Sequence, residues 1–162
     1  MNKIKMFVLL GFASLVLSAC SHSIARQPDF LGEVSAEQLL AQYPAFQDEY
    51  QSYQPSEKEL AAVASLQDDS LVVLFGTWCH DSQREVPRLL KTFDLSGLDV
   101  PKLTLVAVDT KKNDPQGLAK KYALKYTPTF VLLKGDKELG RVVERPKTSL
   151  TQDLQSLSLI TK

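Results

Sequence analysis

Apolar residues fall into short groups along the chain, and their spacing predicts alternating strands and helices. Two groups, residues 71–75 and 103–108, are apolar almost throughout, which is typical of strands buried on both faces of a sheet. Between them, from about Asp81, apolar residues recur every three or four positions and predict a helix. The same reasoning predicts a short helix at residues 117–122, a hairpin of residues 130–133 and 139–143, and a closing helix at residues 148–159.

Three more helices are predicted before the first buried strand. Two capping boxes, in which a serine starts a helix and a residue three positions on completes the cap, are formed by Ser35 with Gln38 and by Ser56 with Glu59. The predicted helices span residues 35–43, 46–53 and 57–66.

The predicted order after residue 66 is strand, helix, strand, helix, hairpin and helix, which indicates an α/β fold. The first two strands should be parallel and joined by a right-handed helical crossover. Pro87 lies inside the connecting helix and should kink it, because proline lacks the N–H that the helix needs.

The first twenty residues have the pattern of a secretory signal. Two lysines precede an apolar run, residues 6–17, that is shorter than the roughly 20 apolar residues a membrane-spanning helix needs. Ser18 and Ala19 then lead into Cys20. This ending resembles the lipobox of bacterial lipoproteins. The resemblance implies that the chain is cleaved before Cys20 and that Cys20 becomes its acylated first residue, for example with palmitate. The alternative is an ordinary signal peptide with a chance cysteine.

The lipobox resemblance implies a protein anchored by lipid at the periplasmic face of the cell envelope. Ser21 follows the cysteine where an acidic residue would favour the inner membrane, so we expect the outer membrane. The predicted organisation is a signal peptide, a lipid-anchored tether, a helical extension and one domain, at residues 1–19, 20–33, 34–55 and 56–160.

The near balance of basic and acidic side chains argues against two classes of partner. The chain has 19 basic and 19 acidic side chains. Loss of the signal would remove two lysines and no acid, which leaves a slight acidic excess. This near balance argues against nucleic acid, and against direct attraction to an anionic membrane surface, so we expect the lipid anchor to make the membrane contact.

The two cysteines have different expected fates. If Cys20 carries lipid, Cys79 has no partner for an internal disulfide, which is unusual in an oxidising compartment. Cys79 follows the first predicted strand and starts a helix, where free backbone N–H groups and the helix dipole favour a thiolate. The alternative is a buried, inert structural cysteine.

The surroundings of Cys79 resemble the thioredoxin superfamily. Trp78-Cys79 matches the start of the family's Cys-x-x-Cys motif, and Pro87 stands where the family has a helix-kinking proline. Residues 126–130, Tyr-Thr-Pro-Thr-Phe, match the segment that holds the family's cis-proline. The resemblance covers about residues 56–159 and implies a thioredoxin-like fold, a central mixed β-sheet flanked by helices, here with an N-terminal helical extension.

The resemblance also implies how substrate meets the cysteine. It implies a cis peptide bond between Thr127 and Pro128, with the Thr127 backbone beside Cys79. That backbone could pair with an extended substrate through strand-like hydrogen bonds. Glu85 adds a resemblance to the membrane-tethered periplasmic thioredoxins of the cytochrome-maturation type, which carry an acidic residue near the active site.

Two positions depart from the family pattern. Ser82 stands where the family has its second, resolving cysteine, and Val73 stands where ordinary thioredoxins bury an aspartate that assists proton transfer. Ser82 cannot release a mixed disulfide as a second thiol would. Its hydroxyl could still donate a hydrogen bond to the Cys79 thiolate.

The first functional hypothesis is a monothiol thiol–disulfide oxidoreductase. Cys79 would form mixed disulfides with a client protein or with a small thiol or disulfide, without a cofactor or a metal. The candidate catalytic residues are Cys79, Ser82 and Glu85, and the candidate substrate-binding residues are Trp78, His80, Thr127 and Pro128. Glu85 would move protons, or else form a local ion pair with Arg84 or Arg88. An imidazolium at His80 would favour the thiolate, or else His80 is a solvated loop residue.

The second hypothesis is a redox-inactive binding module, on the same fold, for a cell-envelope partner. Loss of the resolving cysteine fits such a change of role. Metal binding by Cys79, His80 and Asp81 is disfavoured, because consecutive residues rarely face one ion and no second ligand pair exists. Acyl transfer by Cys79 with His80 is disfavoured because neighbours in sequence seldom make the required hydrogen bond.

Overall fold

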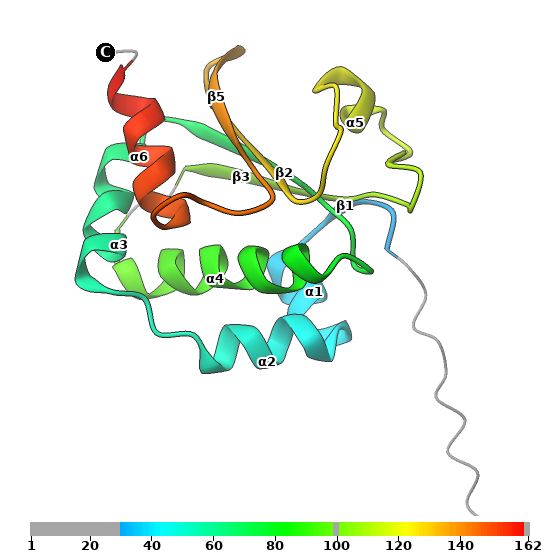
Figure 1. Ribbon diagram of the computed structural model, residues 1–162, viewed down its shortest axis with the longest axis horizontal. Helices are drawn as coiled ribbons and strands as arrows, with labels where there is room; N and C mark the ends of the chain where they lie inside the picture. The colour runs from blue at the N-terminus through cyan, green and yellow to red at the C-terminus, as the bar shows by residue number, and fades with distance from the viewer. Residues whose placement is uncertain (1–29, 99–100, 161–162) are drawn as a thin grey trace, which may run out of the picture.

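The computed structural model describes residues 30–98 and 101–160 (Figure 1). The expected signal peptide, the lipidation site Cys20 and most of the expected tether lie outside this part of the chain. None of the helices that the structure describes is both long enough and apolar enough to span a membrane.

A mixed sheet of five strands forms the centre of the fold, in the order β1-β3-β2-β4-β5. As predicted, β2 and β3 run parallel, with Leu71 opposite Leu103 and Phe75 opposite Ala107. The other neighbours are antiparallel. The strands are β1 (Gly32–Val34), β2 (Ser70–Phe75), β3 (Lys102–Ala107), β4 (Thr129–Lys134) and β5 (Lys137–Val143).

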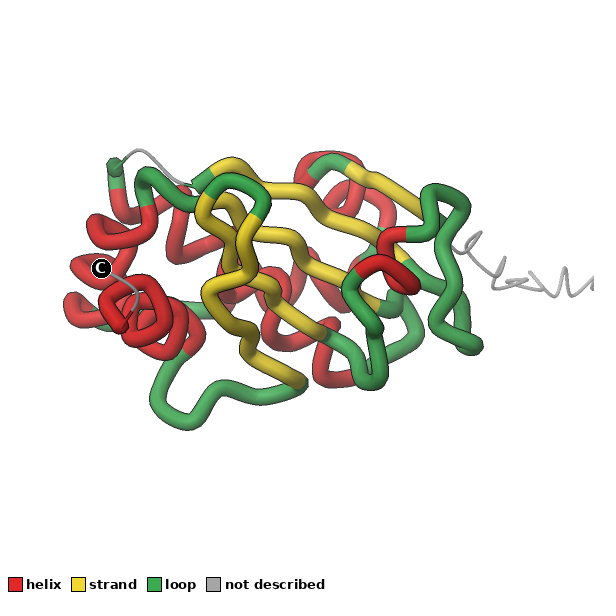
Figure 2. Tube along the Cα trace, turned by 90° about the horizontal axis from the view of Figure 1, so that it is seen from above, coloured by secondary structure: helices red, strands yellow, loops and turns green. Residues whose placement is uncertain are grey.

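Helices cover both faces of the sheet, but unequally (Figures 1 and 2). Most of them pack on one face, while a single short helix, α5, packs on the other. The helices are α1 (Ala36–Gln42), α2 (Pro44–Ser52), α3 (Glu57–Ala62), α4 (His80–Ser96), α5 (Leu118–Lys121) and α6 (Leu150–Ile160), with a 3₁₀ turn, η1 (Val63–Leu66), directly after α3. This confirms the predicted helix-flanked mixed sheet.

The central strand β2 is buried on both sides, as its continuous apolar run predicts. Leu71, Val73 and Phe75 face the larger core beneath the helices, and Val72 and Leu74 face the smaller core beneath α5. Side chains alternate between the faces of a strand, so one six-residue segment supplies both cores. Burial on both faces fixes the carboxyl end of β2, and this end carries the turn that leads to α4.

The N-terminal helices belong to the same core as the rest of the domain. Phe46 of α2 is fully buried, and its ring centroid lies 5.8 Å from that of Phe75 in β2. On the surface, Arg88 of α4 donates to the Glu49 carboxylate of α2 at 2.6 Å. The extension is therefore packed on α4, the helix that follows Cys79.

Two local expectations need correction. Strand β1 was not predicted, because three residues are too few to show an alternation, and it begins inside the segment expected to be a tether. The helix expected over residues 57–66 ends at Ala62 and continues as the 3₁₀ turn η1. Both capping boxes, by contrast, are present with both of their hydrogen bonds.

Candidate functional site

The turn between β2 and α4 presents Cys79. Backbone hydrogen bonds join the Cys79 N–H to the Gly76 carbonyl and the Gln83 N–H to the Cys79 carbonyl, each at 3.0 Å. Cys79 therefore takes the N-cap position of α4. The Gln83 side chain also donates to the Thr77 carbonyl at 2.8 Å, which ties the turn to the first helical residues.

The Cys79 thiol meets the segment before β4. Its sulfur donates to the Thr127 carbonyl at 3.1 Å, although the two residues are 48 positions apart. The peptide bond from Thr127 to Pro128 is cis, as the family resemblance implied. Cys79 is half-buried and has no disulfide partner among the described residues. The residue is thus partly open to solvent while its S–H is held by a backbone acceptor.

Two exposed aromatic side chains flank this contact. Trp78 is 40% exposed and donates its indole N–H to the Val108 carbonyl at 3.2 Å. Tyr126, just before Thr127, is 56% exposed. Exposed aromatic rings beside a backbone edge are suited to contact a polypeptide. The substrate-binding role of Trp78, Thr127 and Pro128 stays a prediction.

Ser82 does not make the hydrogen bond expected of it. Its side chain is fully buried, and its hydroxyl accepts from the Gly76 N–H at 3.3 Å. No hydrogen bond to Cys79 is recorded for it in the part of the chain that is described. The reason is that the third residue after the N-cap faces the interior beneath the turn, so the hydroxyl closes the turn's backbone and does not reach the thiol.

His80 and Asp81 have different surroundings. His80 is exposed, and no hydrogen bond or ion pair to another described residue is recorded for it. Asp81 accepts from the Arg145 guanidinium at 2.9 and 3.0 Å, and Arg84 lies 3.8 Å away. Arg145 comes from the loop after β5 and was not a sequence candidate, because nothing local links it to a residue 64 positions earlier.

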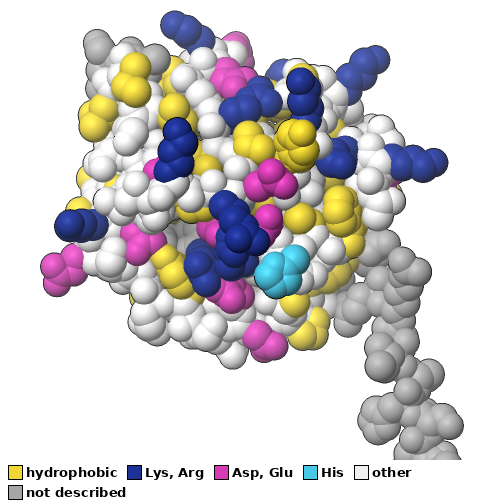
Figure 3. All heavy atoms as spheres, in the orientation of Figure 1, with side chains coloured by type: hydrophobic (Ala, Val, Ile, Leu, Met, Phe, Trp, Pro, Cys, Tyr) yellow, Lys and Arg dark blue, Asp and Glu magenta, His cyan; other side chains and the backbone are white. Residues whose placement is uncertain are grey.

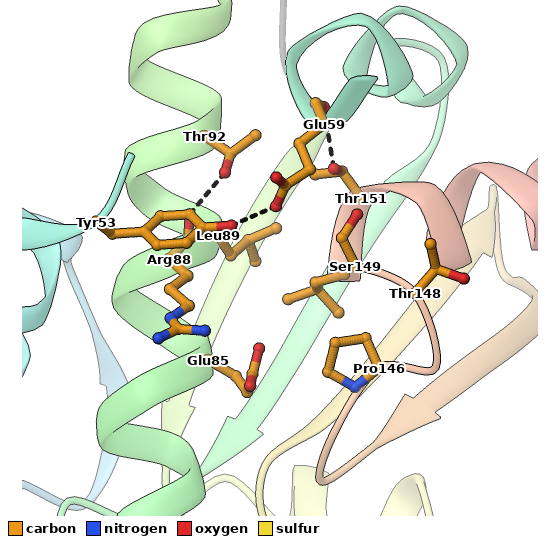
Figure 4. A pocket seen from close by; sticks show the side chains of 11 residues that line it. Tyr53, Glu59, Glu85, Arg88, Leu89, Thr92, Pro146, Thr148, Ser149 and Thr151 are labelled. Atoms are coloured by element: carbon orange, nitrogen blue, oxygen red, sulfur yellow. Dashed lines mark hydrogen bonds between the residues drawn. The ribbon is translucent and has the colours of Figure 1, made fainter. Parts of the chain in front are cut away.

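Glu85 lies in a side pocket of about 190 Å³ and not against Cys79. Figure 4 shows Glu85 pointing from α4 toward Pro146 of the β5–α6 loop. Six residues of helix place Glu85 about 9 Å further along the axis and on another side of it. The Glu85 side chain is only 5% exposed and forms the local ion pair with Arg84, at 2.7 Å.

The far wall of the side pocket is a tyrosine–carboxylate pair. Tyr53 donates its hydroxyl to Glu59, and Thr151 donates to the Glu59 carbonyl at 3.0 Å (Figure 4). Burial and the bond to Glu59 raise the pKa of Tyr53. Burial alone would raise the pKa of Glu59, but hydrogen bonds from Tyr53 and Ser56, with Arg88 nearby, outweigh it and lower that pKa below 4.5.

Nothing in the described residues is arranged as a metal centre. No three His, Cys, Asp or Glu side chains gather in residues 30–98 and 101–160. The turn itself offers a partly exposed thiol beside a backbone edge.

Comparison with known proteins places the chain in a family. Residues 54–156 match the protein-family model described as Thioredoxin. No curated protein matches the chain. Among solved structures, a protein of unknown function from Pseudomonas aeruginosa has a TM-score of 0.50 at 18% identity, over 79% of this chain and 97% of that one. This likeness shows the fold alone.

Plant thioredoxins are also among the matching structures. The short form of thioredoxin f from spinach chloroplast has a TM-score of 0.43 at 23% identity, over 60% of this chain and 82% of that one. A thioredoxin from Nicotiana alata has a TM-score of 0.42 at 22% identity, over 67% and 96%.

Proposed function

This chain belongs to the thioredoxin family, whose fold is that of thioredoxin-type redox proteins, and we propose that it carries out thiol–disulfide exchange through one cysteine, Cys79. The observation that carries the proposal is the 3.1 Å contact between the Cys79 sulfur and the Thr127 carbonyl. This contact sets a half-exposed thiol beside the backbone edge on which an extended substrate can dock.

The proposed cycle has two exchange steps. The Cys79 thiolate attacks one sulfur of a client disulfide, so a mixed disulfide forms and the other client sulfur leaves as a thiolate that takes up a proton. An external small thiol, ionised, then attacks the client sulfur of the mixed disulfide. Cys79 is released as a thiolate, and the external thiol stays bonded to the client. A client sulfenic acid would react in one step, with loss of water.

Each neighbour of Cys79 has a distinct proposed task. Trp78 and Tyr126 contact the client on either side of the thiol, and the Thr127–Pro128 backbone aligns it. Ser82 positions the turn through Gly76 and takes no part in the exchange. Without a second thiol in the motif, the mixed disulfide should be long-lived until an external thiol arrives.

We further propose that the protein works at the periplasmic face of a membrane, attached through lipid on Cys20. The support is the sequence pattern that ends in Ser-Ala-Cys. Labelling cells with radioactive palmitate tests it: the full chain should incorporate label and fractionate with the outer membrane. A Cys20→Ser variant that is labelled equally would refute it.

The exchange proposal is tested on the full chain carrying Cys20→Ser, in which Cys79 is the one thiol. An aromatic disulfide that releases a coloured thiolate is mixed with it, and Cys79→Ser serves as the blank. The expected result is release faster than from free cysteine at the same pH. Ser82→Cys should then prevent accumulation of the mixed disulfide, because the second thiol resolves it. Release no faster than from free cysteine would favour the redox-inactive binding module.

A further inference from the structure

A groove of about 550 Å³ separates the end of β5 from α6. β5 is an edge strand: β4 pairs with one side of it, and no other described strand pairs with its outer side. Figure 2 shows β5 at the margin of the sheet beside α6. We call this the β5–α6 groove and define it by Val143, Arg145, Lys147, Asp153 and Leu157.

The groove has an apolar floor. Val143 is 37% exposed at the end of β5, although large apolar side chains elsewhere on this strand are at least partly buried. Leu157 of α6 is half-buried and lies close against the strand, since a Cβ at Gly140 would come within 2.7 Å of it. An apolar side chain from a partner can therefore rest on Val143 and Leu157.

The walls of the groove are predominantly basic. The one acid of its lining, Asp153, accepts from the backbone N–H groups of Lys147 at 2.6 Å and Thr148 at 3.2 Å, and the other charged residues of the lining are basic. Lys147 is exposed, and no ion pair with a described residue is recorded for its ammonium group. Arg145 is bonded to Asp81 on one side, yet 61% of its side chain stays exposed. Figure 3 shows Lys and Arg side chains spread over this face of the molecule, with Asp and Glu side chains among them.

One residue of the groove is bonded to the helix that follows the thiol. Arg145 joins it to Asp81, two residues after Cys79. On the other side of the thiol, the Glu144 N–H donates to the Pro128 carbonyl at 2.8 Å, which fixes the start of the β5–α6 loop against the cis-proline segment. Arg145 and the Glu144 backbone thus connect the groove to the two segments that surround Cys79.

We propose that the β5–α6 groove binds an extended acidic segment of the client protein, next to the client cysteine that pairs with Cys79. The segment lies along the outer edge of β5, with a carboxylate at Lys147 and Arg145 and an apolar side chain on Val143 and Leu157. This inference rests on the proposed exchange function and deepens it, because it specifies the chemistry of the client.

The test uses two synthetic peptides, each with one cysteine joined by a disulfide to a coloured leaving thiol. The cysteine is followed by glutamates and a leucine in one peptide, and by lysines and a leucine in the other. The full chain with Cys20→Ser should react with the acidic peptide about tenfold faster or more, within the range of electrostatic steering. The preference should shrink as salt is raised.

Two matched charge reversals locate the effect. Lys147→Glu should abolish or invert the preference, whereas Lys120→Glu, an exposed lysine on α5 across the sheet, should leave it unchanged. Lys120→Glu should also react with the small aromatic disulfide at the parent rate, because Lys120 belongs neither to the groove nor to the turn that carries Cys79. Equal rates for the two peptides, or equal loss of preference in both variants, would overturn the groove proposal.

A binding measurement separates this proposal from the exchange function. The acidic peptide with serine in place of cysteine and a fluorescent label should bind the full chain, and Lys147→Glu should weaken that binding, even if Cys79 proves unreactive. Failure of this peptide to bind would overturn the groove and leave the exchange function standing. Two other results would also overturn the groove proposal without affecting the exchange function. One is binding to anionic vesicles that depends on Lys147, and the other is a dimer that Lys147→Glu dissociates.

Discussion

The Ser82 hydroxyl accepts a hydrogen bond from the Gly76 N–H at 3.3 Å, beneath the turn that presents Cys79. Both residues are buried. The serine that replaces the family's second cysteine thus satisfies a backbone donor in the interior. The substitution removes the resolving thiol but keeps the turn closed.

Replacement of Ser82 by alanine should destabilise the fold without changing the thiol. The Gly76 N–H would lose the acceptor that the structure gives it, which costs about 1–3 kcal/mol of unfolding free energy when the group is buried. Urea denaturation measures this change. Ser156→Ala, on the exposed face of α6, is the control and should stay within about 0.5 kcal/mol of the parent. Equal stabilities of the two variants would contradict this role for Ser82.

Gly76→Ala should displace the Trp78 ring. A Cβ at residue 76 would lie 2.5 Å from the indole, and the backbone around it is fixed by the turn. Trp78 is the single tryptophan, so its emission reports the change directly. We expect a red shift as the ring loses its bond to Val108. Gly140→Ala is the control, because its Cβ would meet Leu157 and not Trp78, and its emission should be unchanged. Similar spectra for the two variants would contradict the close contact between residue 76 and the Trp78 ring.

Stability should fall as the pH drops below the usual range for a glutamate, and Glu59 should account for part of the loss. Its pKa is lower in the folded chain than its usual 4.5, because the hydrogen bonds from Tyr53 and Ser56 outweigh burial. The folded state therefore binds fewer protons than the unfolded state near pH 4, so the stabilisation is complete above the unfolded pKa and is lost on acidification.

Urea titrations at several pH values between neutrality and pH 4 measure this dependence. Glu59→Gln should flatten the slope, whereas Glu57→Gln, an exposed residue in the same helical turn, should leave it intact. A slope that is unaltered in Glu59→Gln would contradict the role assigned to this carboxylate.

The N-terminal extension should be required for the stability of the whole domain. Phe46 is fully buried against Phe75 of the central strand, so Phe46→Ala should cost about 3–5 kcal/mol. The unfolding transition should remain single and shift to lower urea. Ala45→Gly, an exposed position one residue earlier in α2, provides the control for effects on the helix itself. A loss in Phe46→Ala no larger than in that control would mean that the extension folds apart from the domain.

Local pattern was sufficient for most elements of the fold. Continuous apolar runs predicted β2 and β3, and the serine–glutamine and serine–glutamate pairs predicted the starts of α1 and α3, because these signals act within a few residues. β1 gave no such signal, since its strand character comes from pairing with β3 seventy or so positions later.

The sequence by itself determined the kind of protein this is: its resemblance to the thioredoxin superfamily at Trp78-Cys79, Pro87 and residues 126–130 implied the family, and local capping and periodicity predicted a cysteine at a strand–helix turn. Only the tertiary structure decided how that cysteine is surrounded. It turned Ser82 inward to Gly76 and Glu85 aside to Arg84, and it brought Arg145 to Asp81. These contacts depend on which faces of α4 meet the sheet and the β5–α6 loop, and packing between distant segments sets those faces.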